Sequence, residues 1–230
     1  PSDSLFRLTL LILNMAYARR MTSAGQAKRR YDARSRQNQA LQNRERVLAV
    51  ARRLFVEHGY AGTSVARIAA EAGVSAPTVF AGFTSKVNLL KQAVDTAIAG
   101  DTDDRPLRDR PVLRHVHEGR TFDDVVERMA DAFAEVAPRA YPIYAVVHGA
   151  ADGDPQIAAL LRELDAQRLT GAELLAATIA DRLGRDDVPE IRDALWVLMS
   201  PLQYGMIVRD LGRPVTWYRD WVARALRTLG

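Results

Sequence analysis

The spacing of the apolar residues limits the fold more than any other feature of this sequence. The first clear stripe, at i, i+1, i+4, i+7 and i+8, is formed by Val47, Leu48, Ala51, Leu54 and Phe55. Similar helical periods run through residues 122–136 and 155–183. No stretch alternates apolar and polar residues as a half-buried strand would. The sequence therefore predicts an all-α fold.

Prolines set the expected interruptions between these helices. Pro138 and Pro142 are expected to break the chain between two helices, because proline removes a backbone donor and clashes with the preceding turn. Pro201 is expected to kink one helix that covers residues 189–211. A further helix is expected over residues 214–229, and residues 100–120 are expected to form a loop.

Charge is divided unevenly along the chain. Residues 1–99 hold 15 Lys and Arg against 6 Asp and Glu, a net charge of +9. Residues 100–230 hold 17 against 22, a net charge of −5. The front half could therefore meet a polyanion that the back half need not touch, although uneven charge is also common in ordinary globular proteins.

The sequence has few of the residues that several kinds of catalytic or metal site require. The 230-residue chain has no Cys, which excludes disulfides, a cysteine nucleophile and a thiolate zinc site. Of its four His, His115 and His117 lie in the expected loop and lack the i, i+4 spacing of a helical zinc pair. We therefore expect no catalytic residues, no metal and no cofactor. The apolar run Leu8–Leu13 is too short to span a bilayer, so a cytoplasmic protein without a membrane partner is expected.

Three regions are expected. Residues 1–38 form a flexible basic arm, within which residues 1–20 contribute little to function. Its cluster Lys28–Arg36 either lies in a DNA minor groove or only aids solubility. Residues 39–85 form a DNA-binding domain, and residues 86–230 form a second helical domain.

The segment 59–90 has the organisation of a helix-turn-helix. Thr63 is placed to cap a short helix, a tight turn follows at Ala72–Ser75, and Ser75 caps a second short helix. Such a pair of helices places the second one in a DNA major groove, with its N-terminal residues at the base edges. The residues expected to face the bases are Ala76, Pro77 and Thr78.

The same segment resembles the DNA-binding signature of the tetracycline-repressor (TetR) family. The matching positions are Leu54-Phe55, Gly59-Tyr60, Thr63-Ser64-Val65, Ile68-Ala69, Ala72-Gly73-Val74-Ser75, Thr78-Val79-Phe80, Phe83, Ser85-Lys86 and Leu89-Leu90. The resemblance implies a three-helix DNA-binding domain followed by a helical bundle that binds a ligand and forms a dimer. The sequence departs from the family pattern at Gly82, at Val87 and at Phe80, where the family commonly has Tyr.

The resemblance implies a ligand-responsive transcriptional regulator, expected to be a repressor, that binds a near-palindromic operator as a homodimer. Thr63 could contact a phosphate or serve only as a helix cap, and Lys86 matches the family's phosphate-contacting lysine. Arg44 and Arg46 could reach a phosphate or the minor groove. The expected DNA contacts are Arg44, Arg46, Thr63, Ser64, Ser75, Ala76, Pro77, Thr78, Phe80 and Lys86.

The back half is expected to hold a cavity for an unknown small-molecule effector and the dimer interface. The candidate ligand contacts are Met129, Phe133, Tyr141, Tyr144, His148, Trp196, Met199, Gln203 and Tyr204. The candidate dimer contacts are Leu198, Leu202, Trp217, Trp221 and Val222. The alternative is a helical enzyme or interaction module that uses the bundle cavity, with the basic front half incidental.

Overall fold

The computed structural model describes residues 37–102 and 111–230, and the chain divides into two units at Arg46 and Val47. In the first unit residues 37–46 are helical, and the Arg46 side chain hydrogen-bonds the Asn43 side chain. Most of the predicted basic arm, including Lys28–Arg36, lies outside the described residues.

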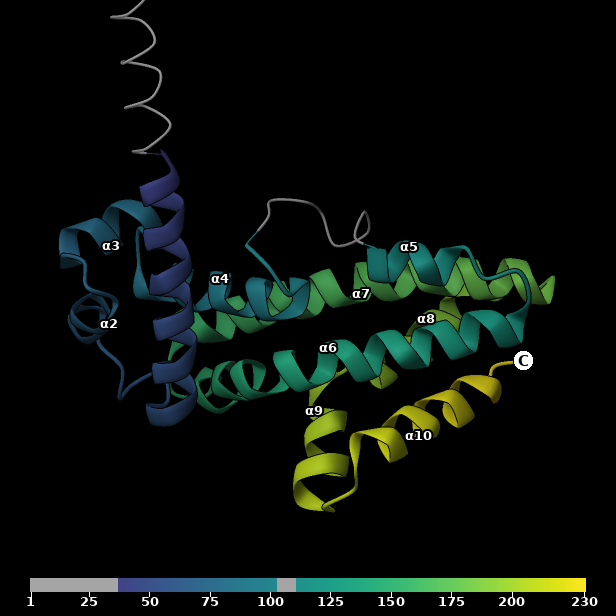
Figure 1. The fold of residues 1–230 in the computed structure, drawn as a ribbon. Helices are drawn as coiled ribbons and strands as arrows, with labels where there is room; N and C mark the ends of the chain where they lie inside the picture. The colour runs from purple at the N-terminus through teal and green to yellow at the C-terminus, as the bar shows by residue number, and fades with distance from the viewer. Residues whose placement is uncertain (1–36, 103–110) are drawn as a thin grey trace, which may run out of the picture. The chain divides into compact units, whose positions relative to one another are not determined.

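The second unit begins with four helical segments. Residues 47–58 are helical and lead to α2 (Val65–Ala72), α3 (Ala76–Phe83) and α4 (Lys86–Ala99) (Figure 1). No residue in the described ranges is in a strand, which confirms the predicted all-α class.

A serine precedes each of α2, α3 and α4, and one glycine makes the turn between α2 and α3. The side chains of Ser64, Ser75 and Ser85 each accept a hydrogen bond from a backbone N–H in the first turn of α2, α3 and α4. Gly73 adopts φ +67°, a left-handed conformation that favours glycine, and its N–H caps the end of α2. This local chemistry fixes where the second helix of the motif starts.

A helical bundle follows. Its members are α5 (Pro111–His117), α6 (Phe122–Ala151), α7 (Pro155–Leu183), α8 (Val188–Leu198), α9 (Pro201–Tyr204), the π-helical segment Gly205–Asp210 and α10 (Val215–Arg227). The long helix α6 is central, because α4, α5, α7, α9 and α10 all pack against it (Figure 1). The predicted helix at residues 214–229 is present as α10.

The predicted break at Pro138 and Pro142 is wrong. Helix α6 continues through both prolines to Ala151. An internal proline costs a helix about 3 kcal/mol. Ala137, Ala140 and Ile143 are buried beside the prolines, so contacts with the surrounding helices offset the missing backbone hydrogen bonds.

Two further predictions also need correction. The expected loop at residues 100–120 contains helix α5. Pro201 does more than kink a helix, because α8 ends at Leu198 and a new helix starts at Pro201. Ser200 has ψ 125°, in keeping with the extended conformation that proline favours in the residue before it.

Two apolar clusters form the core. The first combines residues of the helix-turn-helix, such as Phe55 and Val79, with residues of α6 and α7, such as Ile143 and Leu160. It therefore crosses the boundary predicted at residues 85 and 86. The second cluster fills the far part of the bundle and includes Val222, whose exposed fraction is 0%. Val222 thus belongs to the core of its own chain, and its predicted place on the dimer surface is wrong.

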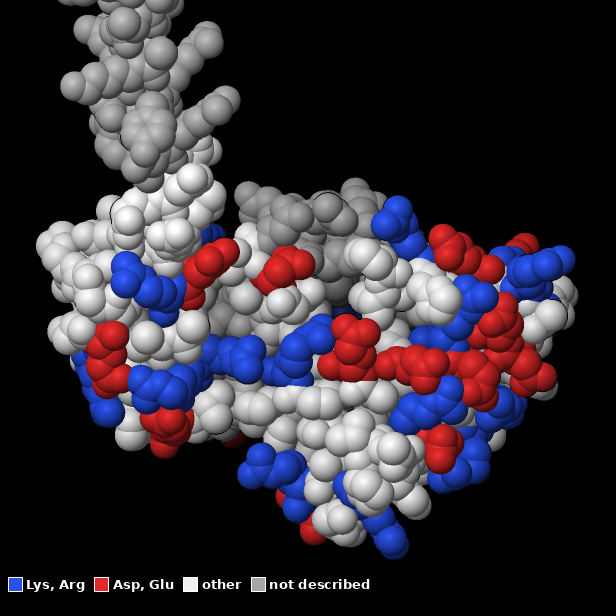
Figure 2. All heavy atoms as spheres, in the orientation of Figure 1, with Lys and Arg blue, Asp and Glu red and all other residues white. Residues whose placement is uncertain are grey.

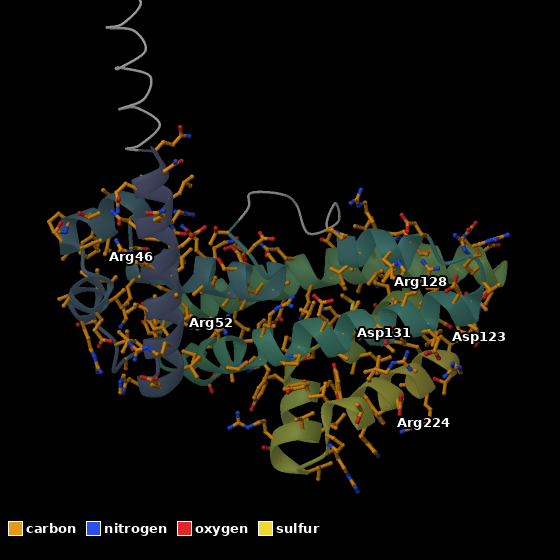
Figure 3. All side chains as sticks on the ribbon, in the orientation of Figure 1. Arg46, Arg52, Asp123, Arg128, Asp131 and Arg224 are labelled. Atoms are coloured by element: carbon orange, nitrogen blue, oxygen red, sulfur yellow. The ribbon has the colours of Figure 1, made fainter. Side chains whose placement is uncertain are left out.

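Ion pairs join α10 to α6 along their outer side. Arg219 binds Asp131 at 2.8 Å and also binds Glu127, while Arg227 binds Glu127 and Asp123. Figures 2 and 3 show the interleaved acidic and basic side chains on this face. The hydrogen bond from Arg219 lowers the pKa of Glu127. Such partly exposed pairs contribute little individually, so the buried contacts of α10 carry most of its attachment.

A glycine permits one close contact inside the bundle. A Cβ atom at Gly205 would lie 2.1 Å from a ring carbon of Tyr141. Gly205→Ala must therefore displace a packed aromatic ring, and we expect it to lower the free energy of unfolding by about 1–3 kcal/mol, measured by denaturant titration.

Gly149, in α6, is the matched control. A Cβ atom there would meet nothing within 4 Å. Gly149→Ala should therefore raise the free energy of unfolding by about 0.4–1 kcal/mol. Equal effects of the two substitutions would contradict the packing described for Tyr141.

Candidate DNA interface and ligand pocket

Helix α3 has one buried face and one exposed face. Val79 and Phe83 are buried, whereas Pro77 and Thr78 are exposed. The ring of Phe80 is also exposed, at 49%. A helix with this division can lie in a groove while its inner face anchors it to the domain. Predicted base-facing Ala76 is only half exposed.

Two hydroxyl groups meet at the start of α3. The oxygen atoms of Ser75 and Thr78 are 2.7 Å apart, and Ser75 also accepts the backbone N–H of Thr78 at 3.2 Å. Both side chains are exposed. Their hydroxyls can rotate, so each can offer a donor or an acceptor to a base edge or a phosphate.

Thr63 does not have the position predicted for it. Its side chain is 1% exposed, and its hydroxyl lies 3.0 Å from the carbonyl oxygen of Leu54 and 2.9 Å from that of Gly59. It ties the end of one helix to the start of the next and cannot reach DNA. Ser64 is the N-cap of α2 and is exposed, so it is the residue of this pair that a phosphate could contact.

Lys86 is half-buried at the start of α4. Its ammonium nitrogen lies 4.0 Å from the centre of the Tyr60 ring, a cation–π contact. Burial lowers the pKa of Lys86, and the nearby Asp154 opposes that shift. The lysine is therefore oriented by the DNA-binding domain before any DNA is bound.

The other cations of this domain differ in their partners. Arg53 pairs with Glu57 and Glu71, and Arg67 also pairs with Glu71, so local carboxylates balance these charges. Arg52, labelled in Figure 3, is exposed and has no ion pair among the residues described. Sequence reasoning did not single it out, although the pair Arg52-Arg53 is visible in the sequence. Arg44 and Arg46 belong to the first unit, and their contact with DNA stays a prediction.

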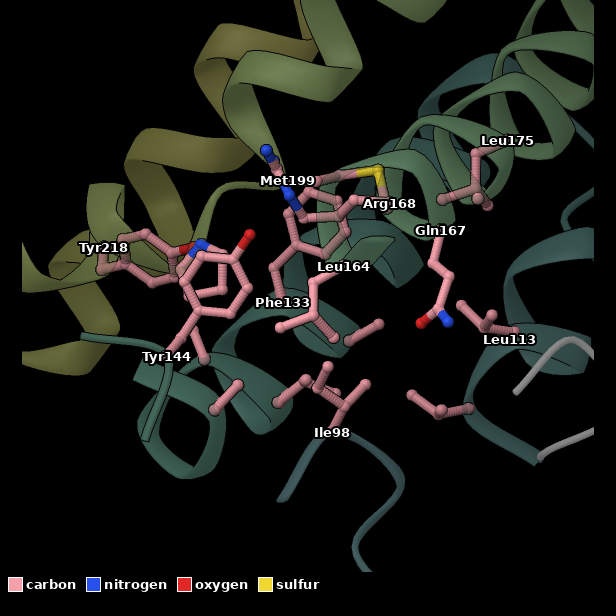
Figure 4. A pocket seen from close by; sticks show the side chains of 17 residues that line it. Ile98, Leu113, Phe133, Tyr144, Leu164, Gln167, Arg168, Leu175, Met199 and Tyr218 are labelled. Atoms are coloured by element: carbon pink, nitrogen blue, oxygen red, sulfur yellow. The ribbon is translucent and has the colours of Figure 1, made fainter. Parts of the chain in front are cut away.

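A cavity of about 180 Å³ lies within the bundle. Figure 4 shows its wall, which is mostly aliphatic and aromatic. The lining residues include Ile98 from α4, Phe133 and Tyr144 from α6, Leu164 and Arg168 from α7 and Tyr218 from α10.

Three of the nine predicted ligand contacts line this cavity: Phe133, Tyr144 and Met199. The six that do not are Met129, Tyr141, His148, Trp196, Gln203 and Tyr204. His148 is exposed, whereas Met129 is fully buried in the second apolar cluster. Sequence reasoning missed Arg168 and Tyr218 as lining residues. Arg168 had a signal, because a basic residue follows the apolar Leu164 by one helical turn.

Arg168 is held in place by a small polar network. Its guanidinium lies over the Trp196 ring at 4.6 Å, and it donates to the Trp196 carbonyl at 2.6 Å and to Asp165 at 3.1 Å. Tyr144 donates its hydroxyl to the same Asp165 at 2.6 Å. Burial, with help from this hydrogen bond, raises the pKa of Tyr144 to about 12.

Other kinds of site are not seen in the described part of the chain. No cluster of His, Asp or Glu there could hold a metal ion. None of the helices described is long and apolar enough to cross a membrane.

Known proteins resemble this chain in sequence and in structure. Residues 47–93 match the family model of bacterial regulatory proteins of the tetR family. The transcriptional repressor ComR of Escherichia coli is 34% identical over 98 residues, which span 41% of each protein. The transcriptional regulator CymR of Pseudomonas putida is 27% identical over 190 residues, covering 81% of this chain and 86% of CymR.

A solved structure has the same fold. A Saccharomonospora viridis transcriptional regulator, crystallised with choline, covers 80% of this chain and 95% of its own length, with a TM-score of 0.58 and 19% identity. Together, the exposed recognition helix and these matches define a helix-turn-helix, DNA-binding transcriptional regulator. More particularly, residues 47–93 carry the DNA-binding region that the tetR family model describes.

Thr78 provides a test of base reading. Thr78→Val keeps a methyl group and removes the hydroxyl, whereas Thr78→Ser does the reverse. If the hydroxyl contacts a base directly, only Thr78→Val should relax preference at one or two base pairs, by about 1–3 kcal/mol. Competition binding with single-base operator variants measures this. Thr216→Ala, at an exposed position of α10, is a control that should change nothing.

Lys86 provides a test of phosphate contact. Lys86→Ala should weaken binding to all DNA sequences alike and reduce the slope of log K against log salt by roughly one. Lys91, also in α4, is the control because Asp95 and Glu163 already pair with it. The same slope change for Lys91→Ala as for Lys86→Ala, or no change for either, would rule out a specific phosphate contact at Lys86.

Proposed function

We propose that this protein is a repressor that binds a near-palindromic operator as a homodimer and leaves it when a small molecule enters the bundle cavity. The names of relatives support repression, since ComR is called a repressor. The choline complex of the Saccharomonospora viridis regulator supports a small-molecule effector, although not its identity.

The observation that carries this proposal is that helix α4 runs from the helix-turn-helix to the cavity. Its first residue, Lys86, lies beside the helix-turn-helix, and Ile98, near its other end, lines the cavity. Arg139 of α6 donates to the carbonyl oxygens of Ala97 and Ile98 at 3.3 and 3.4 Å. A ligand that displaces the end of α4 would therefore also move the residues next to the DNA.

The ligand must distinguish two arrangements to act in this way. It changes operator affinity only if it binds the released arrangement more tightly than the DNA-bound one. A shift from 99% bound to 99% released requires about 5.5 kcal/mol of differential binding. The wall of the cavity combines α4, α6, α7 and α10, so a change in the packing of these helices would change the contacts of a bound ligand.

A second copy of the chain is the proposed partner of α8 and the π-helical segment Gly205–Asp210. Three large apolar side chains are exposed on these elements and directly after them: Val197 at 49%, Met206 at 59% and Leu211 at 68%. The predicted contacts Leu198, Leu202, Trp217 and Trp221 are partly buried against the core of their own chain, and their part in a dimer stays a proposal. A two-fold interface would set the two recognition helices about 34 Å apart, one turn of DNA.

The alternative of an enzyme or interaction module has less support. TetR-family proteins are regulators rather than enzymes, and the cavity wall is mainly apolar. A regulator of transcription works where the chromosome is, and we therefore propose a cytoplasmic location.

Val197 tests the dimer. Val197→Asp places a charge on the apolar surface of α8, so it should lower both dimerisation, measured by sedimentation at micromolar concentration, and operator affinity. It should not unfold the monomer, because the side chain is already half exposed. Val56→Asp, at 43% exposure on the helix of residues 47–58, is the control and should sediment as wild type does. A wild-type monomer that still binds a palindromic operator tightly would refute the dimer.

A further inference from the structure

Some polar side chains of the cavity wall have hydrogen-bond partners within the protein, and others have none among the described residues. Tyr218 is only 2% exposed and lines the cavity. Its ring packs against Tyr204 and Trp221. Its hydroxyl makes no hydrogen bond with any residue in the described ranges. A nearly buried hydroxyl in this position is a vacant site for a ligand atom.

The second polar group without a complete set of partners is Arg168. Its Nε atom is buried and has no acceptor among the described residues. This N–H can only donate. Tyr144, by contrast, already gives its hydroxyl hydrogen to Asp165. Of these two groups, the Arg168 Nε–H can only donate and the Tyr218 hydroxyl can donate or accept, so an acceptor atom is the partner that suits both.

The charges of the wall are already balanced. Arg168 pairs with Asp165, and Arg168 is the only Lys or Arg among the lining residues described. An anionic ligand would lose its hydration without gaining an unpaired cation. Burial raises the pKa of Tyr218, so its hydroxyl stays a neutral donor at physiological pH.

We propose that the cavity binds a compact, uncharged molecule with an apolar body and one acceptor of the carbonyl type, and that the Tyr218 hydroxyl donates to this acceptor. The inference rests on the effector cavity of the proposed function and names its chemical class. Figure 4 shows Tyr144 and Tyr218 toward one end of the cavity and Gln167 and Leu113 toward the other. Gln167 is exposed and its amide donates to Glu163, so the buried polar end is the one that holds Tyr218.

The cavity also limits the size of the ligand. An apolar cavity of about 150 Å³ holds a benzene molecule. The cavity here, about 180 Å³, is somewhat larger and therefore suits a benzene-sized ring with a small substituent. Three probes of that size share one shape and differ only in the polar group: acetophenone has a carbonyl, cumene has none and benzoate has a charged carboxylate.

Calorimetric titration of the full chain with these three probes tests the proposal. Acetophenone should bind wild type more tightly than benzoate does. In Tyr218→Phe, acetophenone should lose at least roughly fivefold in affinity, because its carbonyl is left unpaired. Cumene should change less than about twofold, since it makes no hydrogen bond. Tyr204→Phe is the control: it removes a hydroxyl from the neighbouring ring, which does not line the cavity, and should leave all three affinities unchanged.

Other results would overturn the proposal. These are tighter binding of benzoate than of acetophenone, an equal loss for acetophenone and cumene in Tyr218→Phe, the same loss in Tyr204→Phe, or no binding of any probe up to its solubility limit. DNA retention by the ligand-free protein is measured separately. If acetophenone binds as expected but leaves DNA binding unchanged, the proposed regulation is wrong while the ligand class stands.

Discussion

The packing of α4 against α6 is the constraint on which the rest of the structure depends. Leu89, Leu90, Ala93 and Val94 of α4 are buried in the same apolar cluster as Ile143 and Val147 of α6. Protein interiors are packed too closely to deform smoothly, so a shift of α6 must move α4 or open a gap. The helix-turn-helix and the bundle therefore share one packed core, as the proposed response to a ligand requires.

The sequence was most informative where local chemistry decides the structure. The turn at Ala72–Ser75 and the cap at Ser75 predicted where α2 ends and where α3 begins. Thr63 shows the limit of such reasoning. It was a plausible cap, but the hydroxyl of Ser64 took that role while Thr63 turned inward to two carbonyl groups. Two adjacent residues of similar propensity cannot be separated without knowing which one the tertiary structure buries.

The sequence was least informative where long-range packing decides the structure. Pro138 and Pro142 have the local properties of helix breakers, yet α6 passes through both because five helices pack against it. The cavity was similarly difficult, because its wall combines residues from distant parts of the chain. Most of the predicted ligand contacts were aromatic residues, whereas most of the cavity wall consists of small and aliphatic side chains. No local sequence pattern indicates which face of each helix lines the cavity.

The central claim is that α3 reads DNA and that two copies do so together. Selection of bound sequences from a random DNA pool by the wild-type protein tests it most directly. The account predicts enrichment of two inverted half-sites whose centres lie about 34 Å apart along the DNA, one helical turn. Recovery of a single half-site would contradict the paired arrangement, and recovery of no preferred sequence would contradict sequence reading by α3.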